Sequence, residues 1–137
     1  MKTPFEVIVL YLLPVIRRDL AMELVTSYKM KQADVGRLFG VTDAAISQYL
    51  KNKRGASVLV ESSEYYPVLL EEVRKSAAAV QSDEKDVVLE LCRLCHFARK
   101  IGLTTELFIA VTGCSKEYGE TVIAGFDACM KDQIKSA

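Results

Sequence analysis

Apolar and polar positions follow the period of an α-helix along most of the chain. In residues 15–28, for example, Ile16, Leu20 and Leu24 fall on one face, together with Val25. We expect this helix to cover the segment that follows it, with Arg17, Arg18 and Glu23 turned away. The pattern as a whole predicts an all-α fold, or nearly so.

Helix-start and helix-stop residues divide the pattern into segments. Thr3 and Pro4 open a helix that runs to about residue 13, where Pro14 kinks or breaks it. Residues 55–64 form the candidate linker, and its residues 57–61 fit a short strand, a wing or a loop. Further helices are predicted over residues 67–80, from a Ser82 or Asp83 cap to Gly102, from a Thr104 or Thr105 cap to Gly113, and over residues 115–134.

Two short helices joined by a tight turn are predicted within residues 32–54. The first, Gln32–Phe39, ends at Gly40, which can take a positive φ at no Cβ cost. Thr42 then caps a second helix over residues 43–51. Gly36 lies where the two helices come closest. The apolar positions expected to face inward are Val35, Leu38, Phe39, Val41, Ile46, Tyr49 and Leu50.

The second helix of this pair has an outer face of short polar or small side chains, and cations follow it directly. Side chains of this length suit contacts with base edges in a DNA major groove, and the cations suit phosphate. The candidate DNA contacts are Gln32, Thr42, Asp43, Ala44, Ser47, Gln48, Lys51, Lys53 and Arg54.

The stretch QADVGRLFGVTDAAISQYLKNKR resembles the helix-turn-helix of phage-repressor-type (Cro/C1, XRE-like) regulators. The wider run from Phe5 to Gly55 is similar to a family of predicted archaeal and bacterial transcriptional regulators with a cysteine-bearing C-terminal part. The resemblance implies a DNA-binding domain over residues 1–57 and a helical sensor and dimerisation domain over residues 58–137. It covers the second half only through CRLCHFARKIGL, and Gly36 departs from the alanine usual at its position.

Charge and hydropathy narrow the function classes. Residues 1–57 carry nine Lys/Arg against five Asp/Glu, a net of +4, whereas residues 58–137 carry −4, so charge would steer the first half toward DNA. No segment approaches the roughly 20 apolar residues that a membrane helix needs. Together with the lack of signal-peptide features, this predicts a cytoplasmic protein without a membrane partner. With one histidine, no phosphate loop and no GxSxG, we do not expect an enzyme.

A single recognition helix contacts few base pairs, so we expect a homodimer on a pseudo-palindromic, double-stranded operator. Half of the residues are hydrophobic, a high share for so short a chain, which favours an apolar surface between subunits. The candidate dimer surfaces are the apolar helix over residues 5–13 and the last helix, with Val122, Ile123 and Phe126.

The cysteines are Cys92, Cys95, Cys114 and Cys129. Four thiolates suit an iron–sulfur cluster (4Fe–4S or 2Fe–2S) or zinc, and the spacing lacks the second CxxC of a zinc ribbon, which favours the cluster. A disulfide switch and plain buried cysteines are the alternatives. His96 fits either a substitute ligand or a surface residue. The acidic runs at residues 71–72, 83–84 and 86–90 are expected to be solvated.

These observations predict a sequence-specific DNA-binding transcriptional regulator that responds to redox state or to an iron–sulfur cluster. The alternative is a metal- or cluster-binding adaptor whose helix-turn-helix contacts a protein and does not read DNA. A small redox enzyme that uses Cys92 and Cys95 is a third hypothesis.

Overall fold

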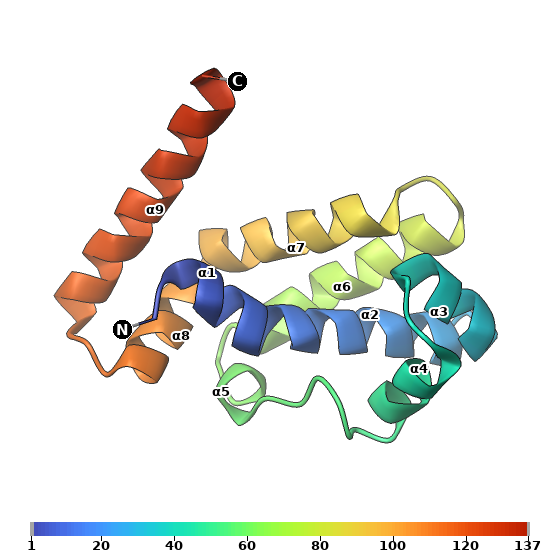
Figure 1. Ribbon diagram of the computed structural model, residues 1–137. Coiled ribbons are helices and arrows are strands. Elements are labelled where there is room, and N and C mark those ends of the chain that lie inside the picture. The colour runs from blue at the N-terminus through green and yellow to red at the C-terminus, as the bar shows by residue number, and fades with distance from the viewer. Residues whose placement is uncertain (1, 137) are drawn as a thin grey trace.

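The computed structural model describes residues 2–136, and side chains as far as residue 131. The described residues are helical and contain no strand, which confirms the all-α prediction (Figure 1). None of their helices is long and apolar enough to span a membrane. The elements are α1 (Pro4–Val7), the π-helix η1 (Ile8–Leu12), α2 (Leu13–Thr26), α3 (Gln32–Phe39), α4 (Asp43–Leu50), α5 (Val58–Glu61), α6 (Tyr66–Gln81), α7 (Val87–Ile101), α8 (Leu103–Thr112) and α9 (Lys116–Ser136).

The first three elements form one continuous helical rod, so Pro14 does not break the helix, which was one of the two outcomes predicted for it (Figure 1). Thr3 caps the rod as expected, because its side chain accepts a hydrogen bond from the backbone N–H of Glu6. The rod then widens into η1, where the N–H of Leu13 donates to the carbonyl of Ile8. Pro14, the second residue of α2, comes directly after this wider turn.

α2 lies at the centre of the fold and contacts α3, α4, α6 and α7. Its fully buried side chains include Ile16, Leu20 and Leu24, and burying a side chain of this size contributes about 1.5–3 kcal/mol. The same core continues from Val7 to Ile123. The two parts expected from the sequence therefore share one interior, and their division at residue 57 stays a prediction.

Three helices end at the glycines that the sequence predicted, but α7 and α8 begin at other residues than predicted. Gly40, Gly102 and Gly113 take positive φ at the ends of α3, α7 and α8. α7 is capped by Asp86, whose side chain accepts from two backbone N–H groups, and not by Ser82 or Asp83. α8 begins directly after Gly102 without a threonine cap. α5 is a single helical turn in the segment that the sequence left open.

α9 extends away from the rest of the fold and contacts α8 and α1 (Figure 1). Phe126 packs edge-on against Phe5, with ring centroids 4.7 Å apart. Ile123 and Phe126 are buried within their own chain, and Val122 is half-buried. The prediction that these residues form a dimer surface is corrected for Ile123 and Phe126, because α1 and α8 already cover them.

Arg18 is the centre of a buried polar network, although the sequence predicted it to face solvent. Its Nε and Nη2 donate to Oδ1 of Asp19, at 2.9 and 2.8 Å, and its Nη1 lies 2.9 Å from Oε1 of Glu61. Nη1 also donates to Oδ1 of Asn52, at 3.1 Å. The hydroxyl of Tyr66 donates to Oδ2 of Asp19, at 2.6 Å. The network thus joins α2, the loop after α4, α5 and α6.

Burial shifts the pKa values of two members of this network. Loss of solvent raises the pKa of Asp19, although the hydrogen bonds from Tyr66 and Arg18 oppose the rise. Burial and the neighbouring Asp19 carboxylate likewise raise the pKa of Tyr66. Arg18 is therefore the cation on which the Asp19 charge depends, since a buried carboxylate without a partner is costly.

We predict that Arg18→Ala lowers the free energy of unfolding by about 3–5 kcal/mol, because it leaves Asp19 buried without its cation. The matched control is Arg17→Ala, which removes the exposed neighbour and should change the value by less than about 0.5 kcal/mol. Urea unfolding followed by circular dichroism measures both. Equal effects of the two substitutions would contradict the role of Arg18.

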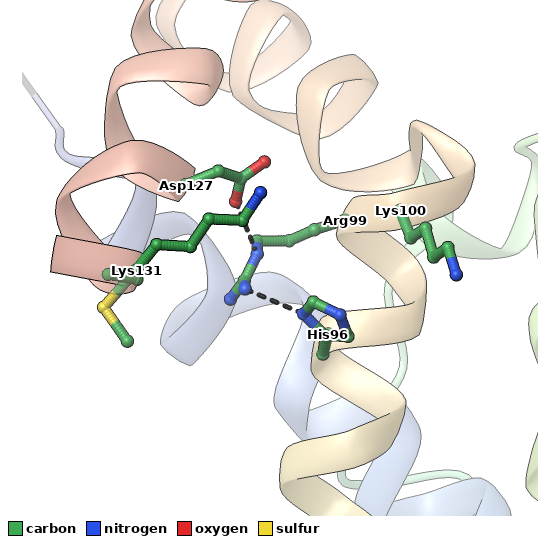
Figure 2. Close-up of a pocket in the computed structure, with 6 residues that line it drawn as sticks. His96, Arg99, Lys100, Asp127 and Lys131 are labelled. Carbon is green, nitrogen blue, oxygen red and sulfur yellow. Dashed lines mark hydrogen bonds and ion pairs between the residues drawn. The ribbon is translucent and has the colours of Figure 1, made fainter. Parts of the chain in front are cut away.

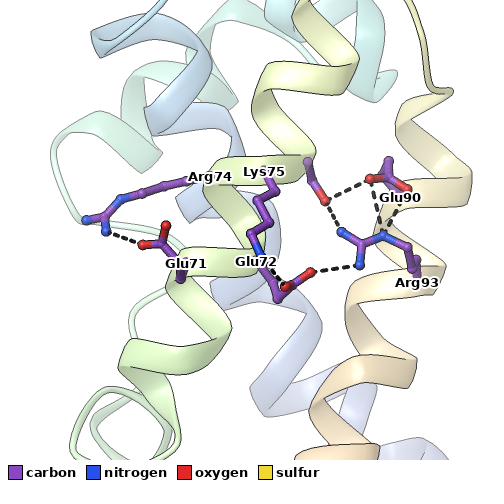
Figure 3. A network of polar contacts seen from close by, with 7 residues as sticks. Glu71, Glu72, Arg74, Lys75, Glu90 and Arg93 are labelled. Atoms are coloured by element: carbon purple, nitrogen blue, oxygen red, sulfur yellow. Dashed lines mark hydrogen bonds and ion pairs between the residues drawn. The ribbon is translucent and has the colours of Figure 1, made fainter.

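A second polar network joins α6 to α7 (Figure 3). Arg93 reaches from α7 to Oε2 of Glu72 on α6, at 2.9 Å, and its Nη2 donates to Oγ of Ser76, at 2.8 Å. Glu90, expected to be solvated, is instead buried and accepts a hydrogen bond from Ser76, at 2.9 Å. Glu90 is therefore paired with Ser76 on α6 and with Arg93 on the next turn of its own helix.

The hydrogen bond from Arg93 lowers the pKa of Glu72 below its usual range. A depressed carboxyl pKa contributes stability above the ordinary glutamate pKa of about 4.3, and that stability is lost as pH falls through the lower folded value. The wild type should therefore lose free energy of unfolding between pH 7 and pH 3. We predict that the loss in Glu72→Gln is smaller by about 0.5–1 kcal/mol. Glu71→Gln, in an exposed pair with Arg74, is the control and should follow the wild type. Parallel curves for wild type and Glu72→Gln in urea unfolding would contradict the assignment.

Candidate nucleic-acid interface

α3, a tight turn and α4 form the predicted helix-turn-helix, with α3 bounded as the sequence indicated. Gly40 takes φ 67° at the end of α3. The N–H of Val41 then donates to the carbonyl of Gly36, at 2.9 Å, which turns the chain back. Thr42 caps α4 by accepting from the N–H of Ala45, at 3.1 Å, and Asp43 lies in the first turn, where its charge suits the helix dipole.

Gly36 lies where the turn crosses α3. A Cβ atom on this residue would lie 2.8 Å from the backbone carbonyl oxygen of Val41, closer than atoms pack in proteins. Repressor-type motifs usually have alanine at this position. Glycine is needed here because the backbone of the turn lies so close to α3.

The inner side of the pair is anchored in the core. Val35, Ile46 and Tyr49 are buried, as predicted. Leu38, also expected to face inward, is 40% exposed and lines a shallow cavity with Met30 and Val80. This prediction is corrected: Leu38 lies at the edge of the fold, beside the end of α6.

The outer side of α4 is open to solvent. Thr42, Asp43, Ala44 and Gln48 are exposed, and Ser47 is half-buried. Gln32, at the start of α3, is also exposed. The oxygen of Thr42 already serves as the helix cap, so its hydroxyl hydrogen is the part left for a partner.

The predicted cations Lys51, Lys53 and Arg54 are all exposed in the loop after α4. The N–H of Lys53 donates to the carbonyl of Gln48, at 2.8 Å, which ties the loop to the end of the helix. The outer face and the loop together present polar side chains followed by three cations, the arrangement by which proteins contact base edges and phosphates.

The sequence pattern did not indicate the residues that hold this loop in place. Asn52 takes φ 59° and accepts a hydrogen bond from Arg18. Gly55 takes φ 82°, and a Cβ on it would lie 2.6 Å from the carbonyl oxygen of Pro14 and 2.7 Å from Cβ of Arg18. The available signal was Asp19, which comes four residues after Val15 and three after Ile16 and therefore falls among the apolar positions of the helix.

Cys92 and Cys95 line the same groove, whereas Cys114 and Cys129 lie on other parts of the fold. Cys92 and Cys95 are on α7, Cys114 lies between α8 and α9, and Cys129 is on α9; all four are free. In the part of the chain that the structure describes, no group of three or more His, Cys, Asp or Glu is placed to hold a metal. Burial raises the pKa of Cys95 to about 11.

This arrangement does not fit an iron–sulfur cluster or zinc on Cys92, Cys95, Cys114 and Cys129. Both groups stay predictions from the sequence, and iron, sulfide and zinc analysis of protein purified without oxygen tests them. Cys95 and Cys114, which are half-buried and pack against the hydrophobic core, are placed as core cysteines would be. His96 is exposed and its Nδ1 lies 3.0 Å from Nη2 of Arg99.

Comparison of the chain with protein-family models, with curated proteins and with solved structures finds no match. The resemblance to repressor-type regulators therefore stays a prediction that rests on the residues of α3, the turn and α4.

We predict that Gly36→Ala destabilises the fold by about 1–2 kcal/mol, because the clash with Val41 outweighs the gain in helix propensity of about 1 kcal/mol. Gly125→Ala is the matched control. A Cβ at this position in α9 meets no atom within 4 Å, so the propensity gain should appear as higher stability. Thermal unfolding measures both, and two stabilised variants would contradict the close approach at Gly36.

Proposed function

We propose that this protein is a sequence-specific, double-stranded-DNA-binding transcriptional regulator. The observation that carries the proposal is the orientation of α4. Ala45, Ile46 and Tyr49 anchor the helix in the core, and its polar positions point outward. A helix anchored on one side and polar on the other is free to enter a major groove, whose width of about 12 Å admits an α-helix.

The chemistry of the outer face supports base contacts. Gln48 carries an amide that can pair with adenine through both its oxygen and its nitrogen. Ala44 is short enough to let the helix approach and to contact a thymine methyl group. Asp43, beside them, can accept a hydrogen bond from the amino group of cytosine and repels misplaced phosphate.

The loop after α4 supports backbone contacts. Lys51, Lys53 and Arg54 are exposed, and none has an ion pair among the described residues. Because Asn52 and Gly55 fix the path of the loop, these cations are held beside the end of α4 and do not trail freely. Ordered cations lose less conformational entropy on binding phosphate.

One α4 contacts only a few base pairs, so the proposal includes a homodimer that places two such helices about 34 Å apart on a pseudo-palindrome. Val9 and Leu10, on η1, are 58% and 54% exposed and are the apolar side chains that we assign to this contact. Such a regulator acts in the compartment that holds the DNA, in keeping with the cytoplasmic prediction. A redox or cluster response through the cysteines is a separate prediction on which DNA binding does not depend.

We predict that Gln48→Ala and Lys53→Ala change DNA binding in different ways. A DNA site is first selected from a random library, and binding to it and to random DNA is then measured by fluorescence anisotropy at several salt concentrations. Gln48→Ala should lose about 1–3 kcal/mol on the selected site only, because it removes a base contact. Lys53→Ala should weaken both DNAs alike and reduce the salt slope by about 1, because it removes a phosphate contact.

Lys116→Ala is the control, since Lys116 is an exposed cation on α9, away from α4 (Figure 1). It should bind both DNAs as the wild type does. If the wild type does not bind random DNA at low salt, the proposal is wrong and the protein-interaction adaptor takes its place. If Gln48→Ala and Lys53→Ala change specificity equally, the assignment of α4 as the base-contacting element is wrong.

A further inference from the structure

The rod, α7 and α9 enclose a groove of about 430 Å³ on the side of α7 that faces α1. This volume lies within the range of small-molecule sites, about 300–1,000 Å³. Its walls are mostly apolar, with contributions from three separate parts of the chain. The apolar wall residues include Phe5, Ile8, Leu13, Val88, Leu91 and Phe126.

Two of these apolar side chains are not covered by the chain itself. Phe5 is 56% exposed and Val88 is 60% exposed, although both line the groove. A ligand with an apolar body would remove this surface from water, which contributes about 25 cal/mol for each Å².

Most of the charged side chains at the groove are positive. Arg17 and Arg99 line it together with His96, and an adjoining cavity of about 360 Å³ adds Lys100 and Lys131. Asp127 is the one acidic residue among the described residues that line either cavity, and its Oδ1 lies 2.9 Å from Nε of Arg99 (Figure 2). Within the described residues, no ion pair or hydrogen bond engages Arg17 or Lys131.

We propose that this groove binds an amphipathic organic anion: an apolar chain or ring with a single carboxylate or sulfonate. The apolar body would lie against Phe5, Val88 and Phe126, and the anionic head would meet Arg17 and Arg99. A neutral apolar ligand would offer no charge to Arg17, which has no ion pair among the described residues, and a cationic ligand would be repelled by both arginines.

The charge pattern also argues against a second copy of the chain as the occupant. A two-fold dimer across this face would bring the same surface of both subunits together. Arg17, Arg99 and Lys131 of both subunits would then lie in one interface, and like charges gathered in this way cost binding energy.

The test uses the full-length protein and 1-anilinonaphthalene-8-sulfonate, an aromatic sulfonate whose fluorescence rises in an apolar site. Decanoate, decanol and decylammonium then compete for the site, since they share a chain length and differ in charge. We expect decanoate to displace the probe at a concentration about tenfold lower than decanol, because a charge-assisted contact adds to the same apolar burial. Decylammonium should be the weakest competitor.

Two neighbours on α7 supply a matched pair of variants. Val88→Asp places a negative charge in the groove, whereas Leu89→Asp places it on an exposed side chain, 67% accessible, that does not line the groove. Val88→Asp should weaken decanoate binding about tenfold, and Leu89→Asp should stay within about twofold of the wild type. Arg17→Gln, also exposed, should weaken decanoate about tenfold and leave decanol unchanged.

Several outcomes would overturn the proposal: no displacement by decanoate, equal competition by decanoate and decanol, or equal effects of Val88→Asp and Leu89→Asp. A wild-type dimer that Val88→Asp converts to a monomer in sedimentation would also overturn it, because a second copy would then cover the groove. The measurements contain no DNA, so their failure leaves the proposed DNA binding standing, and a failure of DNA binding leaves the ligand site standing.

Discussion

The buried ion pair of Arg18 with Asp19 is the interaction on which the arrangement of the N-terminal half depends. Both side chains are removed from water within the central helix, where an isolated charge would cost several kcal/mol. Their partners are Glu61, Asn52 and Tyr66, which come from three other parts of the chain. The charge pair therefore requires those parts to be in place, and it sets where the loop after α4 can lie.

This requirement connects the core to the candidate DNA surface. α4 is anchored by apolar side chains, as any core helix is, but the loop that follows it has few apolar residues with which to pack. Asn52 and Gly55 attach that loop to α2 through a hydrogen bond and a close backbone contact. The exposed cations between and beside them are therefore positioned by a polar network and not by hydrophobic burial.

α2 also joins the two candidate surfaces of the molecule. Arg17 lines the apolar groove beside α7 and α9, whereas the adjacent Arg18 belongs to the network behind the DNA-facing loop. Successive residues on a helix point about 100° apart, so one turn of α2 serves both sides. The thiols that the sequence suggested as the sensing element are instead distributed over α7, α9 and the connection before α9. Two of them, Cys92 and Cys95, lie in the wall of that same groove.

The features that could be predicted from the sequence depend on residues within about four positions of one another. They include the bounds of α3, the left-handed glycine at residue 40 and the cap at Thr42, because caps and turns are local hydrogen bonds. Which polar groups are buried depends instead on contacts between residues far apart in the chain. Arg18 meets Asn52 and Tyr66, 34 and 48 positions away, and Glu90 meets Ser76 on another helix. The exposure of Leu38 and the separation of the cysteines also depend on tertiary contacts. Helical periodicity indicates on which face of a helix a residue lies, but not what packs against that face.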